Sequence, residues 1–87
     1  MTVEWESHVI PLQGRNLVII KAARGYLMCG YLNLEAAERF GDAAAVVTGV
    51  SSADDALKAE VRGVTIKARE LGVKPGMRGE EALKLMS

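Results

Sequence analysis

The chain has 87 residues, 49% of them hydrophobic, which is enough for one domain near the low end of the sizes that fold alone. Its 11 basic residues balance 11 acidic ones, so no net charge draws it to nucleic acid or to an anionic membrane. One cysteine excludes an internal disulfide, and no apolar run approaches the roughly 20 residues of a membrane span. We expect a single cytoplasmic domain over residues 1–87, without a nucleic-acid or membrane partner.

Two strands are predicted at the start of the chain. Residues 3–12 alternate imperfectly between apolar and polar side chains, and Pro11 assigns this strand to an edge of the sheet because proline cannot donate to a ladder. Residues 17–22 are apolar except for Lys21 and predict a second strand. Residues 23–25 are short enough for a tight hairpin, with Gly25 expected at positive φ.

Residues 25–32 read GYLMCGYL and predict the central strand. The segment carries no charge, and its apolar side chains fall on both alternating faces. A strand that is apolar on both faces is usually covered on both faces. It also holds Cys29, the only cysteine. The first three strands should therefore form an antiparallel meander that ends inside the sheet.

A helix and a fourth strand are expected next. Asn33 is a good N-cap, residues 34–40 are rich in helix formers, and Gly41 stands where a helix-ending glycine belongs. Residues 44–50 are small or β-branched and predict a buried strand. Because strand–helix–strand connections are right-handed crossovers, this fourth strand should lie parallel to the third, in the spatial order 1-2-3-4.

The rest of the chain predicts helices. Ser52 and Asp55 have the spacing of a helix cap, and residues 60–71 show a helical stripe that ends before Gly72. Residues 79–86 predict a last short helix. The expected fold is α+β: a two-layer α/β sandwich in which three to four short helices cover a four-stranded mixed sheet.

Three segments together resemble the YunC-like family of small bacterial and archaeal proteins. They are residues 25–32, Gly49-Val50, and residues 71–83, which read LGVKPGMRGEEAL. The resemblance runs from about residue 16 to residue 86, and the two longer segments are specific in combination, although neither is a catalytic signature. It implies a two-layer α/β sandwich and no established activity.

Cys29 and His8 are the weak candidates for catalysis. Cys29 could be a nucleophile, but thiolate activation needs a helix N-terminus or a nearby cation, which a position inside a strand does not supply. His8 is the only histidine, hence the only candidate for the base of a Cys-His pair, and it is expected two strands away. A buried structural thiol is the reading we favour, since free cysteine packs as a small hydrophobe.

A ligand site is better sought where parallel strands end. At that edge helix N-termini present free amides, and the predicted topology gathers Asn33, Gly49, Ser51 and Ser52 there. These residues could bind a small anion or carboxylate, whereas the structural alternative is that Asn33 and Ser52 only cap their own helices. No metal or cofactor is expected, because one cysteine and one histidine are too few ligands for a zinc site.

Two classes of function remain open from the sequence. The first is a non-enzymatic module that self-associates or binds a small ligand or protein partner, since no residue constellation supports turnover. The second is a small enzyme that uses Cys29 with His8 or with an acid from a neighbouring subunit. A homo-oligomer, with a dimer favoured, is expected because small domains with an exposed sheet edge often associate.

Overall fold

A computed structural model describes residues 5–87, so the first two residues of the expected first strand lie outside the described part. One sheet contains the strands β1 (Glu6–Pro11), β2 (Asn16–Lys21), β3 (Tyr26–Met28), β4 (Ala44–Val46) and β5 (Gly63–Val64). The helices are α1 (Leu34–Phe40), α2 (Ala53–Lys58), α3 (Ile66–Glu70) and α4 (Gly79–Leu85). None of the described helices is long and apolar enough to cross a membrane.

The sheet has the spatial order β1-β2-β3-β4-β5. β1, β2 and β3 form the expected antiparallel meander, with Ile20 opposite Leu27. β4 runs parallel to β3 after the crossover through α1, with Leu27 opposite Ala45. The central place of β3 and the parallel fourth strand are therefore confirmed.

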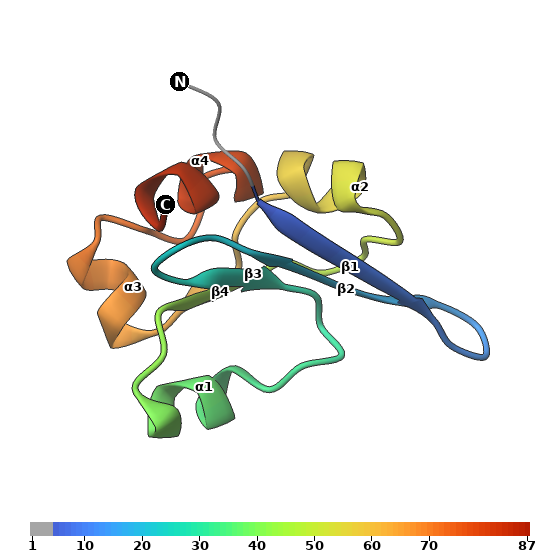
Figure 1. Ribbon diagram of the computed structural model, residues 1–87, viewed down its shortest axis with the longest axis horizontal. Coiled ribbons are helices and arrows are strands. Elements are labelled where there is room, and N and C mark those ends of the chain that lie inside the picture. The colour runs from blue at the N-terminus through green and yellow to red at the C-terminus, as the bar shows by residue number, and fades with distance from the viewer. Residues whose placement is uncertain (1–4) are drawn as a thin grey trace.

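Helices cover both faces of the sheet, as Figure 1 shows, with α2 and α4 on one side and α1 on the other. The main core lies on the α2 and α4 side, and Ala68 of α3 joins it. A smaller cluster forms where Ala37 of α1 meets Met28 and Ala44. The α+β class with a mixed sheet is confirmed, and among the described helices α1 is the one that covers the second face.

The helix expected over residues 60–71 was wrong for its first half. Val61 N–H donates to Met77 O, Arg62 N–H donates to Val46 O, and Gly63–Val64 pairs antiparallel with β4 as a fifth strand. Helix α3 starts only after Thr65, whose side chain accepts the Ala68 N–H. The β-branched residues of this segment fit a strand as well as a helical stripe, and pairing with β4 decides between them.

The third and fourth strands are shorter than expected. β3 ends at Met28 because Leu32 N–H donates to Cys29 O and closes a turn. Gly25 does not have the positive φ expected of it. Its lack of a side chain matters for space instead, since a Cβ there would lie 2.6 Å from Ala43 O and 2.6 Å from Met86 Sδ.

The helix ends expected from the sequence are confirmed. Asn33 caps α1 by accepting the Glu35 and Ala36 amides, and Gly41 follows the helix with φ 74°. Ser52 caps α2 by accepting the Asp55 N–H. These short helices thus begin and end where local side-chain chemistry places them.

Candidate functional site

A pocket of about 400 Å³ lies where β3 and β4 end and β2 begins. The three termini meet because β3 is parallel to β4 and antiparallel to β2. Loops after parallel strands are common ligand sites in sheets that contain them. The pocket is lined by Arg15, Asn16, Cys29, Gly30, Tyr31, Thr48, Gly49 and Val50.

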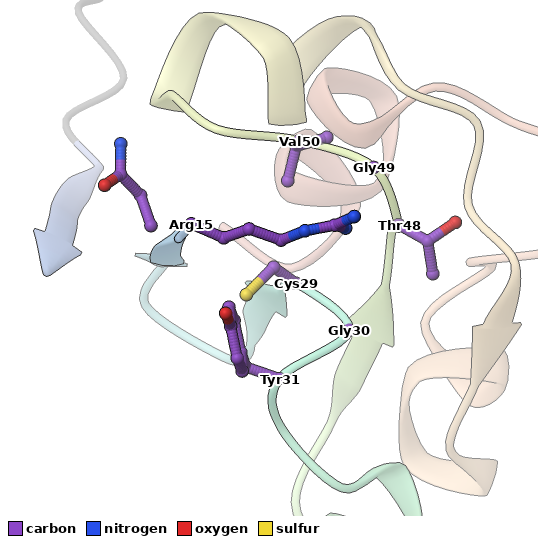
Figure 2. Close-up of a pocket in the computed structure, with 8 residues that line it drawn as sticks. Arg15, Cys29, Gly30, Tyr31, Thr48, Gly49 and Val50 are labelled. Atoms are coloured by element: carbon purple, nitrogen blue, oxygen red, sulfur yellow. The ribbon is translucent and has the colours of Figure 1, made fainter. Parts of the chain in front are cut away.

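Arg15 supplies the only charge among the residues that line this pocket. Figure 2 shows its side chain extending between Cys29 and Val50, with the guanidinium directed towards the loop that contains Gly49. Within residues 5–87 Arg15 makes no ion pair; those that are present join His8 to Glu6, Lys21 to Glu6 and Arg62 to Glu60. Its five donors are therefore available to a ligand or to water.

Cys29 lies one residue beyond β3 and is 3% exposed. Its N–H donates to Val18 O at 3.0 Å, and its Sγ accepts the Val18 N–H at 3.2 Å. In a regular antiparallel pair the second bond would go to the Cys29 carbonyl, which here accepts from Leu32 instead. The thiol thus takes the place of a backbone acceptor at the end of the β2–β3 ladder.

Several residues that line the pocket also carry backbone N–H donors. The N–H groups of Gly30, Tyr31, Thr48 and Gly49 donate to no other residue within 5–87. The loop after β4 is fixed in place because Asn16 Nδ2 donates to Ser51 O at 2.8 Å. The residues that line the pocket thus carry several hydrogen-bond donors without a partner in the described part of the chain, namely the Arg15 guanidinium and these four amides.

A second hollow of about 660 Å³ adjoins the pocket and shares Arg15, Asn16, Gly49 and Val50 with it. Ser51 lines this second hollow. The Ser51 N–H and hydroxyl donate to Asp55 Oδ2 at 3.2 and 3.1 Å. These bonds, the backbone one first, hold the pKa of Asp55 below its usual value. Ser51 thereby ties the pocket loop to the first turn of α2.

His8 is not brought near Cys29. It lies on β1 opposite Ile19, which packs against the α1 cluster, whereas Cys29 belongs to the core on the other face. Its Nε2 lies 2.6 Å from Glu6 Oε2, and this hydrogen bond is the main reason why the pKa of Glu6 is lowered. Within one chain, the Cys-His pair considered above is therefore not assembled.

The four residues considered for anion binding are divided by the structure. Gly49 lines both hollows and Ser51 lines one, while Asn33 and Ser52 cap their helices and line neither. Sequence reasoning missed Arg15, Asn16, Tyr31 and Thr48. The predicted topology did contain a signal for Arg15, because the turn before β2 must lie at the edge where β3 ends.

Comparisons with known proteins give a consistent relationship. The family model described as a domain of unknown function (DUF1805) matches residues 28–86. The "Uncharacterized protein YunC" of Bacillus subtilis (strain 168) is 36% identical over 81 residues, which cover 88% of this chain and 80% of the relative. The crystal structure of a protein of unknown function, TA1206 from Thermoplasma acidophilum, aligns with a TM-score of 0.83 and 31% identity over 99% of this chain and 94% of that one.

Proposed function

This chain belongs to the DUF1805 family, a domain of unknown function, and we propose that it is a non-enzymatic binding module for a small organic carboxylate. The observation that carries the proposal is that Arg15, which has no ion-pair partner within residues 5–87, lines a pocket of about 400 Å³. That volume lies within the range of small-molecule sites in proteins, roughly 300 to 1,000 Å³. On the sequence grounds given above, we assign this binding to the cytoplasm.

The donors of the pocket favour a carboxylate over a more highly charged ligand. A guanidinium presents parallel N–H groups that match the two oxygens of a carboxylate. Arg15 is the only charged lining residue, so one negative charge is balanced inside the pocket. The backbone amides of Gly30 and Gly49 can donate to whichever carboxylate oxygens face away from Arg15.

The remaining lining gives the ligand an apolar part. The Tyr31 ring and the Val50 side chain border the pocket, and Tyr31 is 51% exposed. An exposed aromatic ring beside a charged group is typical of sites that hold an organic body by its surface and its anion by hydrogen bonds. We therefore expect small organic acids with a short apolar chain to bind more tightly than inorganic anions.

Thermal-shift measurements with acetate, butyrate, succinate and inorganic phosphate, each matched by sodium chloride at equal ionic strength, test this function. A ligand that binds only the folded protein raises its stability by about 2.7 kcal/mol at one hundred times its Kd. Butyrate should raise Tm in a saturable manner and by more than succinate or phosphate, which carry more charge than the pocket balances, and butanamide, the uncharged analogue of butyrate, should not raise it. No shift with any of the four anions would contradict the proposal.

The matched variants are Arg15→Gln and Arg69→Gln. Both remove one exposed arginine charge, but Arg69 lies on α3 and lines neither hollow. The carboxylate-dependent shift should disappear in Arg15→Gln and persist in Arg69→Gln. Equal shifts in the two variants would show that the anion binds elsewhere.

A second candidate function is thiol chemistry at Cys29. It is favoured by one observation, that Cys29 lines the same pocket as the cationic Arg15. A cation near sulfur is one of the conditions that activate a thiolate. The base would have to come from a neighbouring subunit, since His8 lies on the opposite face of the sheet and bonds to Glu6.

Alkylation by iodoacetamide separates the two functions. In a binding module with a buried structural thiol, Cys29 should react only when the protein unfolds. Its labelling should therefore slow down when a ligand stabilises the folded state. An enzyme thiol should react rapidly in the native state, and the rate should fall when Arg15 is replaced by Gln.

A further inference from the structure

We propose that the outer edge of β1 pairs antiparallel with β1 of a second copy of this chain, around a two-fold axis at Ser7. β1 lies at one edge of the sheet (Figure 1), and all six of its residues are exposed. In an isologous interface of this kind the same strand serves both sides. The inference is independent of the carboxylate pocket, which lies at the end of β3 and β4.

The hydrogen bonds of β2 show which groups of β1 point outward. Val18 uses both its N–H and its C=O towards Cys29, on the β3 side. Val9, directly opposite Val18, is therefore in a non-hydrogen-bonded pair, and its own N–H and C=O face away from the sheet. By alternation, Ser7 and Pro11 also face outward, while Leu12 donates inward to Arg15 O.

Pro11 limits how far the outer edge can pair. It has no N–H, and it occupies an outward position where the β1–β2 ladder does not need one. Pairing centred on Ser7 places Val9 opposite Trp5 of the second copy and leaves Pro11 beyond this segment. Pro11 therefore blocks pairing with another strand only at the C-terminal end of β1.

Hydrogen-bond complementarity between Glu6 and His8 favours this register. Glu6 and His8 project from the same face of β1 and lie within hydrogen-bond distance of each other. With the axis at Ser7, Glu6 of each copy lies directly opposite His8 of the other, so each cross-strand pair is complementary. A register centred on His8 would instead set the two histidines against each other.

Apolar side chains support the same arrangement on the other face. Val9 is 42% exposed, although it lies directly opposite the fully buried Val18. Trp5 is half-buried and packs against the main core. Opposing Val9 with Trp5 of the second copy would cover an apolar side chain that the helices of one chain leave exposed. The sequence of β1 is therefore complementary to β1 of a second copy of this chain.

Light scattering over a hundredfold dilution from micromolar concentration tests the pairing, using Ser7→Pro and Ser7→Ala. Proline removes an outward donor without removing a bond to β2, whereas alanine keeps that donor. Wild type and Ser7→Ala should have the mass of two chains, and Ser7→Pro that of one. A wild type with the mass of one chain at every concentration would overturn the inference, as would a dimeric Ser7→Pro.

A charge exchange tests the register in variants that leave the backbone unchanged. His8→Glu sets Glu opposite Glu twice in each dimer and should weaken association about tenfold or more. The double variant Glu6→His/His8→Glu restores a glutamate opposite a histidine on each side and should recover most of the affinity. Equal dissociation constants for wild type and His8→Glu would rule out pairing around Ser7.

Discussion

The two ends of the β3–β4 strand pair differ in how far their polar groups are hydrogen-bonded or ion-paired. Where the two strands begin, side chains and backbone fill the space and satisfy one another: Thr65 is fully buried, and its Oγ1 donates to Asp42 O and accepts the Ala44 N–H. Where the strands finish, Arg15 is unpaired within the described chain, and the loop amides donate to no other residue. One end of the same strand pair secures the fold, and the other leaves polar groups without partners in the described chain.

The space around Gly25 and Gly30 differs in the same way between the two ends. A Cβ on Gly25, at the filled end, would meet the Ala43 carbonyl and the Met86 sulfur, both at 2.6 Å. A Cβ on Gly30, at the open end, would meet nothing closer than Thr48 Cγ2 at 3.5 Å, an ordinary contact. Close packing is thus a property of one end of the strands and not of β3 as a whole.

The largest loss of stability is expected for Gly25→Ala, with Gly30→Ala as its control. The first must displace backbone at Ala43 and should lower the free energy of unfolding by about 3 kcal/mol. The second should change it by less than about 0.5 kcal/mol. Urea unfolding of both variants gives the values, and similar costs at the two positions would erase the contrast between the strand ends.

Thr65→Val should lower the free energy of unfolding by about 2 kcal/mol. Valine has nearly the same shape but leaves the buried Ala44 N–H without the hydroxyl that accepts it at 3.0 Å. It also removes the donor to Asp42 O. Thr65→Ser keeps the hydroxyl and should retain more stability than valine in the same urea measurement. If valine proves as stable as threonine, this hydroxyl is not what secures the filled end.

Cys29→Ala should lower the free energy of unfolding by about 1 kcal/mol, because it leaves a small void and removes the acceptor of the Val18 N–H. Cys29→Ser tests the bond separately, since a hydroxyl oxygen can accept from the same N–H. Serine should be at least as stable as alanine if the bond matters more than the apolarity of sulfur. A serine variant well below alanine in urea midpoint would assign the role of Cys29 to packing alone.

The smallest effect concerns pH at the filled end. Burial, and then the hydrogen bond to Asp42, raises the pKa of Tyr26 from 10.0 to about 12. Between those values the folded chain holds a proton that the unfolded chain has lost, so stability falls as pH rises. This contribution is complete below pH 10 and lost towards pH 12.

The measurement is the difference in unfolding free energy between wild type and Tyr26→Phe, followed from pH 9 to pH 12. That difference should shrink across the upper part of the range, because phenylalanine has no proton to lose. A difference that stays constant with pH would show that the phenol does not titrate as its surroundings require.

Local chemistry accounts for what could be predicted. Asn33, Gly41 and Ser52 act within one turn of their own helices, so their roles can be inferred from neighbouring residues. The parallel pairing of β4 with β3 follows from the helical crossover through α1 and needs no distant contact. Both were predicted correctly for these reasons.

Distant contacts account for what could not be predicted. Gly25 is required by Ala43 and Met86, and the latter lies at the far end of the chain. Residues 63–64 form a strand only because β4 offers them an edge. The pocket depends on the turn before β2 meeting two later loops, so Arg15 has no local feature that marks it.

Trp5 and Ser87 supply a built-in optical signal. The indole Nε1 of Trp5 donates to Ser87 Oγ at 2.9 Å, and the Ser87 hydroxyl in turn donates to Leu83 O. Since Trp5 is the only tryptophan in the sequence, all indole fluorescence originates at this contact between Trp5 and Ser87. Its emission therefore reports release of α4 from the start of β1, and an amide-exchange probe within β3 would show whether the middle of the sheet opens with it.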